Sequence, residues 1–292
     1  MDFKHIISDI EKTDPEVYER LSGRREMLSS FGSKVAMAAL PFALASMFKK
    51  AYGQTGTNVV VDALNLALEF EFMQHTYYRQ GTNTGGLIPA NDLPGFKIIE
   101  NQEKAHVAFL EKLITELGGV SFKPKYYASS TTVHPYVPAA YDFTMGSKYI
   151  PFSDYETFLT IAQVLEDTYI HAIQGQVETL QTNNAVLSQA FALAAVEGRH
   201  AAYVRLRRRL AVNAAETPTP WIQNNIPPVP SVAFQKYYLG EDNTIQKGVD
   251  IQALGNIYYP NGAMPQVAAT SAFDEPYTKD TVMTLIAPFK KI

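Results

Sequence analysis

The sequence contains no cysteine among its 292 residues. This absence excludes disulfides, thiol nucleophiles, zinc–thiolate sites and cysteine-bound iron–sulfur clusters. Carboxylates and histidines are then the side chains that could hold a metal ion. Such a donor set suits iron or manganese, with zinc possible.

The sequence also lacks a strong excess of either charge. It has 25 Lys and Arg against 29 Asp and Glu, a net charge of −4 and a pI near 5.9. This balance gives no basic field for nucleic acid, and we expect no nucleic-acid partner. The one basic run, Arg205–Arg209, is interpreted as cations that complement the C-terminal end of a helix. Because 46% of the residues are hydrophobic, a folded core is expected.

An apolar run near the N-terminus is too short to span a bilayer comfortably. Val35–Phe48 instead fits the hydrophobic segment of an export signal. Arg24 and Arg25 resemble a twin-arginine motif, and Ala51–Gly53 offers small residues for cleavage. We therefore predict that residues 1–53 are an export signal and that the mature protein is periplasmic or in the cell envelope, without stable membrane insertion. A buried or interfacial helix is the alternative.

Helical periodicity dominates residues 54–212, which we predict to be one domain. Apolar residues recur at helical spacing in four segments. These segments cover about residues 58–80, 96–117, 153–180 and 184–210.

The connections between these segments predict their arrangement. The loop 81–95 and the turn 182–184 are short and close two helical hairpins, whereas residues 120–152 form a long link. Ser153 is a candidate N-cap for the third helix. We therefore predict an all-α fold, a four-helix bundle with one long crossover.

Residues 213–292 differ in character from the bundle. They begin with a proline-rich stretch and contain short aromatic runs at 232–239 and 257–259. We expect a largely irregular C-terminal extension packed on the bundle, with irregular segments or short strands at these runs and a final helix over 279–287.

Two helices carry a single carboxylate on an apolar face. Glu71 shares its face with Leu64 and Leu68, and Glu166 shares its face with Leu159. A buried carboxylate is costly unless it is paired or coordinated, so each predicts a partner. The adjacent acids Glu69 and Asp167 fall on other faces and are expected at solvent, an interface or a neighbouring helix.

The other two helices each carry a Glu-x-x-His motif. Glu103 with His106, and Glu197 with His200, place a carboxylate and an imidazole one turn apart on one face. Glu103 follows Glu71 by 32 residues and Glu197 follows Glu166 by 31, so the two pairs can lie at the same depth in their hairpins.

With these motifs the sequence resembles the ferritin-like superfamily, and more closely its exported bacterial branch of ferritin-like-domain or desiccation-related proteins. The likeness rests on Ala67–Tyr78, Glu103–Leu110, Leu165–Thr168 and Ala195–Ala202, and more weakly on Phe273–Pro276. It implies two iron or manganese ions bridged by two carboxylates. The implied metal ligands are Glu71, Glu103, His106, Glu166, Glu197 and His200. The bridging pair is either Glu103 with Glu197 or Glu71 with Glu166.

Several residues near these ligands have open roles. In the family pattern, Tyr78 matches a tyrosine beside the metals. Three roles are open for Tyr78 and for Tyr169: each could form a hydrogen bond to a ligand carboxylate, act as a redox group, or be an ordinary packed side chain. His75 is an extra ligand or a core histidine, and His171 lies off the ligand face. Tyr169 and Ile173 depart from the branch pattern, which affects the expected cavity shape.

The resemblance implies two alternative functions. The first is a ferroxidase- or catalase-like oxidoreductase that acts on oxygen or peroxide in metal or oxidative stress handling. The second is a non-catalytic protein for metal binding or stress protection in the cell envelope. A salt-bridged network without metal is disfavoured, because four carboxylates and two imidazoles leave surplus buried negative charge. The extension makes a hollow cage unlikely, whereas a smaller oligomer is compatible with the sequence.

Overall fold

The computed structural model describes residues 57–125, 127, 136–211, 219–229, 231–254 and 262–291. The predicted export signal, residues 1–53, lies outside the described residues. Within the described part of the chain, no helix is both long and apolar enough to cross a membrane.

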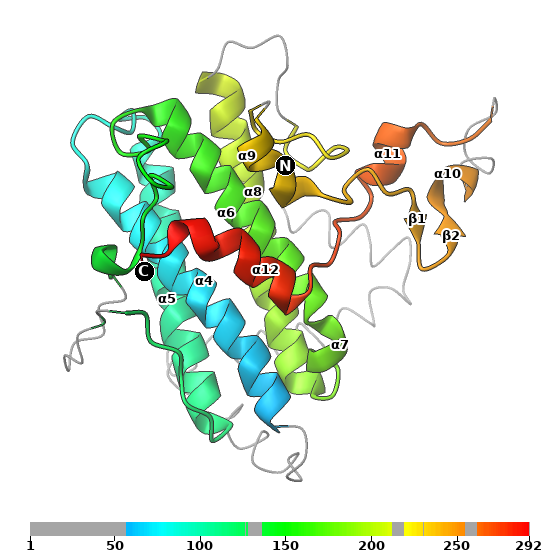
Figure 1. Cartoon of the computed structure of the whole chain (residues 1–292), viewed down its shortest axis with the longest axis horizontal. Coiled ribbons are helices and arrows are strands. Elements are labelled where there is room, and N and C mark those ends of the chain that lie inside the picture. The colour runs from blue at the N-terminus through cyan, green and yellow to red at the C-terminus, as the bar shows by residue number, and fades with distance from the viewer. Residues whose placement is uncertain are drawn as a thin grey trace, which may run out of the picture. The chain divides into compact units, whose positions relative to one another are not determined.

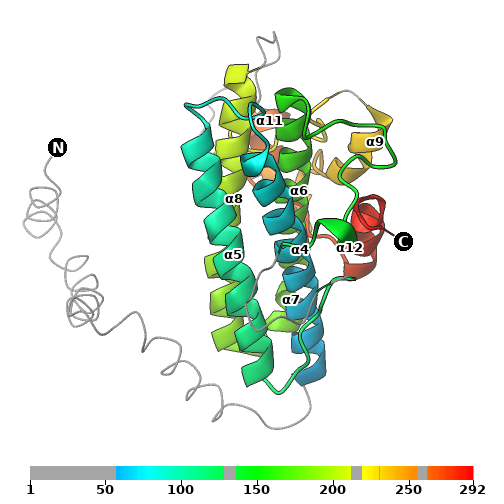
Figure 2. The ribbon, with the colours of Figure 1, turned by 90° about the vertical axis from the view of Figure 1, so that its left-hand side faces the viewer.

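Four long helices run alongside one another and make up the bundle (Figures 1 and 2). Helix α4 packs against α5 and α6, and α6 packs against α8. The all-α bundle with one long crossover is therefore confirmed. The helices are α4 (Thr57–Asn83), α5 (Leu93–Glu116), α6 (Tyr155–Gly175) and α8 (Asn184–Ala211).

The helix ends follow local capping chemistry. Asp154, and not the expected Ser153, caps α6 by accepting from the backbone N–H of Thr157 at 2.7 Å. Both residue types can cap, but the Asp154 carboxylate also accepts from the Thr157 hydroxyl. Asn183 accepts from the N–H of Val186 and so caps α8.

The third predicted helix is interrupted near its C-terminal end. Helix α6 ends at Gly175, and a separate short helix, α7 (Val177–Leu180), follows. The backbone of Tyr277 lies so close that a Cβ atom on Gly175 would fall 1.8 Å from its carbonyl oxygen. The chain thus needs glycine here, and glycine weakens the helix at this point.

An aromatic cluster fills one end of the bundle. Tyr77 and Phe158 stack with ring centroids 5.0 Å apart, and Phe143 and Phe96 pack edge-on against them. Gly81 permits this approach of α4 and α6, because a Cβ atom there would lie 2.3 Å from the Phe158 ring.

The described C-terminal segments pack against one side of the bundle. Helix α12 (Lys279–Ile286) packs on α6 and crosses in front of α4 and α6 in Figure 1. After it, the 3₁₀ turn η4 (Ala287–Phe289) leads to Lys290, which forms an ion pair with Glu69. Glu69 is therefore buried at an interface with this extension.

The expected strands are in part wrong. Residues 232–238 form a short helix, α9 (Val232–Gln235), and the 3₁₀ turn η2 (Lys236–Tyr238). Ser231 caps α9, and the aromatic side chains point into the core instead of pairing as a strand. The second run, 257–259, lies outside the described residues.

The remaining short elements are a hairpin, three single turns and their connections. The hairpin pairs β1 (Ile245–Gln246) antiparallel with β2 (Val249–Asp250). The others are α10 (Ile251–Leu254), α11 (Gln266–Thr270) and, in the crossover, the 3₁₀ turn η1 (Pro138–Ala140).

Candidate metal centre

The six predicted ligands converge inside the bundle, with contributions from all four long helices. Helices α4 and α6 each supply one carboxylate, and α5 and α8 each supply a Glu-x-x-His pair. None is more than 9% exposed. The residues are Glu71, Glu103, His106, Glu166, Glu197 and His200.

The side chains form two overlapping sets of four. The first quartet is Glu71, Glu103, His106 and Glu197, and the second is Glu103, Glu166, Glu197 and His200. In each quartet, one donor atom per residue lies within 4.8 Å of the others. Because Glu103 and Glu197 belong to both quartets, the geometry favours them as the bridging pair over the other assignment.

Each imidazole directs the same nitrogen toward the shared carboxylates. The Nδ1 atom of His106 lies 3.0 Å from Glu197 Oε1 and 3.2 Å from Glu71 Oε2. The Nδ1 atom of His200 lies 2.9 Å from Glu103 Oε1 and 3.3 Å from Glu197 Oε2. The i, i+3 spacing of each motif produces this common orientation.

The two carboxylates shared by the quartets form no well-aligned hydrogen bond, although the Nδ1 atoms of the two imidazoles lie 2.9–3.3 Å from them. All four oxygen atoms of Glu103 and Glu197 are buried without a hydrogen-bond partner, as is Nδ1 of His200. Buried polar atoms are rarely left in this state, since each costs the free energy of its lost hydration. The donor set therefore fits divalent cations between the four helices.

Two tyrosines brace the outer carboxylates across the bundle. Tyr78 on α4 donates a hydrogen bond to Glu166 on α6, and Tyr169 on α6 donates to Glu71 on α4 at 2.6 Å. Burial, together with the carboxylate of Glu71, raises the pKa of Tyr169 well above its usual range. Both phenols thus remain protonated donors that orient the carboxylates.

Two glutamines also contact the ligands and were missed in the sequence. Gln74 donates to Glu166 at 3.0 Å, and Gln102 lies 2.7 Å from Nε2 of His200. A weak signal existed for Gln74, which lies one turn from Glu71 on the ligand-bearing helix. No local pattern indicated Gln102, since its contact joins residues that are 98 positions apart.

The charge of the cluster shifts the pKa values of its members. Burial, with the nearby carboxylate of Glu103, raises the pKa of Glu71 to about 8. Burial alone lowers the pKa of His200, but Glu103 and Glu197 outweigh it and raise the value to about 11. Without metal the cluster therefore retains protons, which divalent cations would displace.

The neighbouring predicted residues lie outside the two quartets. His75 is buried but belongs to neither quartet. His171, off the ligand face as expected, is buried and donates from Nδ1 to the carbonyl of Glu275 at 2.8 Å. Ile173 is buried in α6.

The interpretation of the basic run as helix-end cations is wrong for Arg205, which lies before the last turn of α8, whereas Arg208 and Arg209 do lie in that turn. Arg205 is 4% exposed and forms a buried ion pair with Asp167 on α6. Arg208 is also buried and donates to the carbonyl of Pro228. The C-terminal segments cover this side of α8, so the same arginines that look terminal in sequence become interior.

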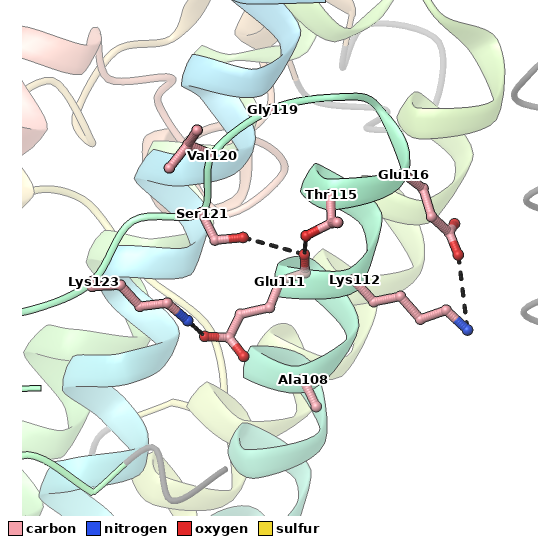
Figure 3. A pocket seen from close by; sticks show the side chains of 9 residues that line it. All are labelled: Ala108, Glu111, Lys112, Thr115, Glu116, Gly119, Val120, Ser121 and Lys123. Carbon is pink, nitrogen blue, oxygen red and sulfur yellow. Dashed lines mark hydrogen bonds and ion pairs between the residues drawn. The ribbon is translucent and has the colours of Figure 1, made fainter. Parts of the chain in front are cut away.

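A surface hollow on the outer side of α5 is separate from the ligands (Figure 3). Its lining includes the ion pairs Glu111–Lys123 and Lys112–Glu116. It contains none of the six predicted ligands.

Comparison with known proteins agrees with the four-helix fold. A family model described as a ferritin-like domain matches residues 60–209, just over half of the chain. No curated protein matches the chain. The matched region contains all six residues of the two quartets.

Proposed function

Since the chain belongs to the ferritin-like domain family, we propose that it binds two divalent ions, iron or manganese, between Glu103 and Glu197. The observation that carries this proposal is the set of four buried carboxylate oxygens that form no well-aligned hydrogen bond. Zinc is compatible with the same ligands, but the absence of thiolates and the number of carboxylates favour iron or manganese.

The protein residues have distinct tasks in this proposal. Glu103 and Glu197, which belong to both quartets, would be shared by the two ions, and each of the other four ligands would hold one. Tyr78 and Tyr169 hold the outer carboxylates in place through their hydroxyl groups. The bundle excludes bulk water, which strengthens the attraction between the carboxylates and the cations.

We propose an oxidoreductase activity at this centre, with oxygen or peroxide as the small-molecule substrate. A bound pair of iron or manganese ions would supply reversible change of oxidation state. Tyr78 lies directly against a ligand carboxylate, a position that suits it to local electron transfer as well as to orientation. The activity would be that of an oxidase or a peroxide-consuming enzyme.

The test combines metal analysis with turnover. Protein purified from its native compartment is expected to contain two ions of iron or manganese per chain and to consume oxygen or peroxide. Glu103→Ala and Glu197→Ala should lose both properties, whereas Glu116→Ala, on the same helix as Glu103, should keep both. Wild-type protein without stoichiometric metal would contradict the proposal.

The alternative is a non-catalytic metal-binding or stress-protection protein. The near-complete burial of the ligands favours it, because the His106 side chain, at 11% exposed, is the most accessible of the group. This version predicts the same two ions but no consumption of either oxidant above the rate of the Glu103→Ala variant.

Export of the protein is a separate proposal that rests on the residues 1–53. We expect a mature chain that begins after Gly53 and is found in the periplasm or cell envelope. Mass spectrometry of the purified native protein measures this directly. We also expect no nucleic-acid partner and no hollow cage.

A further inference from the structure

The two metal positions differ in how their histidines are held. His200 is 4% exposed in its side chain, and its Nε2 atom lies 2.7 Å from the amide oxygen of Gln102. His106 is 11% exposed. The carboxylates differ too, since Glu166 accepts from both Tyr78 and Gln74, whereas Glu71 accepts from Tyr169 and contacts Nδ1 of His106, itself a predicted ligand.

The contact with Gln102 determines which nitrogen of His200 can bind a metal. An amide oxygen only accepts, so Nε2 of His200 must carry the proton in this hydrogen bond. In the neutral ring the lone pair is then on Nδ1. This is the atom that faces Glu103 and Glu197 and is buried without a hydrogen-bond partner.

Such a partner on the remote nitrogen fixes the tautomer and the ring orientation of a metal-bound histidine. Loss of the partner typically weakens metal affinity about ten- to hundredfold. The partner here belongs to α5 and its histidine to α8, so the hydrogen bond also ties together the two helices that carry the bridging carboxylates.

We propose that Gln102 is a positioning residue that holds His200 as an Nδ1 donor and makes the Glu166/His200 position the tighter of the two. This inference rests on the proposed function, in that it requires two metal ions. It assigns the weaker and more readily exchanged ion to the Glu71/His106 position.

The experiment titrates the metal-free protein with Co²⁺ under anaerobic conditions and follows visible absorption. The wild type should show two binding steps. His200→Ala should remove the tighter step and His106→Ala the weaker one. Gln102→Met, which keeps the side-chain length but lacks the acceptor, should weaken the tighter step about ten- to hundredfold and leave the weaker step within about twofold.

Two further measurements separate this role from a general loss of structure. Gln102→Glu retains an acceptor and should restore the tighter step, and all variants should keep the far-ultraviolet circular dichroism of the wild type. In Co²⁺-loaded protein, proton NMR should show a shifted, exchangeable ring N–H signal from His200. Gln102→Met should accelerate the exchange of this proton with solvent.

The possible failures are distinguishable. If the wild type binds no Co²⁺, both the proposed function and this inference are wrong. If the wild type binds two ions but Gln102→Met leaves the tighter step unchanged, or weakens both steps equally, the proposed function stands and the inference on Gln102 is overturned.

Discussion

Glu166 and Asp167 are neighbours on α6, but they belong to two clusters of buried charge that are built in different ways. Asp167 pairs with Arg205 and accepts a hydrogen bond from Tyr238 at 2.7 Å; these three residues are termed the arginine cluster. Glu166 belongs to the acidic cluster, formed by the six residues of the two quartets, in which Glu103 and Glu197 form no well-aligned hydrogen bond.

The comparison separates two ways of compensating a buried carboxylate. In the arginine cluster the compensating cation is part of the chain, so the cluster is complete in the folded protein. In the acidic cluster four carboxylates face two imidazoles, so the chain supplies less positive charge than it needs. The difference indicates that the arginine cluster stabilises the fold and that the acidic cluster binds cations from outside the chain.

The largest expected effect comes from breaking the arginine cluster. Arg205→Met would leave the buried Asp167 without its cation and lower the free energy of unfolding by about 3–5 kcal/mol. Urea denaturation of the metal-free protein measures this change. The exposed Arg209→Met is the matched control and should change stability by less than about 0.5 kcal/mol. Equal effects of the two substitutions would show that the buried pair has no special role.

In the acidic cluster, a substitution is expected to stabilise the metal-free protein instead of destabilising it. Glu103→Gln removes one of several buried negative charges, so it should raise the free energy of unfolding of the metal-free protein by about 2 kcal/mol. The same substitution should abolish the binding of two ions. Denaturation in the presence of EDTA measures the first effect, with Glu116→Gln as the control. A loss of stability as large as that of Arg205→Met would erase the proposed difference between the clusters.

The stability of the metal-free protein should depend on pH through the carboxylate of Glu71 in the acidic cluster. The pKa of Glu71 is raised from 4.5 to about 8, so the folded protein binds more protons than the unfolded chain between these values. The free energy of unfolding of the metal-free protein should therefore fall as pH rises from 5 to 8. Glu71→Gln should flatten this dependence. A wild-type free energy of unfolding that increases from pH 5 to pH 8 would contradict the prediction.

The smallest effect concerns the phenol braces. Tyr169→Phe removes one hydrogen bond to Glu71 and should weaken metal binding by about 1 kcal/mol, which is several-fold in affinity. The matched control is Tyr77→Phe, since the Tyr77 hydroxyl donates to a backbone carbonyl of Phe158 instead of a ligand. Isothermal titration with Mn²⁺ measures both. Equal changes would assign the loss to packing.

The sequence predicts the bundle and the convergence of the six residues because both depend on local periodicity. A spacing of three residues places Glu103 and His106 on one face whatever the rest of the chain does, and apolar neighbours show that the face is interior. The matched intervals then align the two hairpins.

The other contacts could not be predicted, because they depend on chain segments that are distant in sequence. Gln102 and His200 meet only when α5 and α8 are packed. The burial of Arg205 depends on segments of the C-terminal extension, whose irregular path follows no period. The choice between Ser153 and Asp154 as a cap lies within the single-residue uncertainty of any helix boundary.

Crystals of the protein loaded with Mn²⁺ test the central claim most directly, through anomalous difference density at the acidic cluster. We expect two peaks, both in contact with Glu103 and Glu197, with one beside His106 and the other beside His200. An absence of anomalous density between these carboxylates at saturating Mn²⁺ would contradict the assignment of the cluster as a dinuclear metal centre.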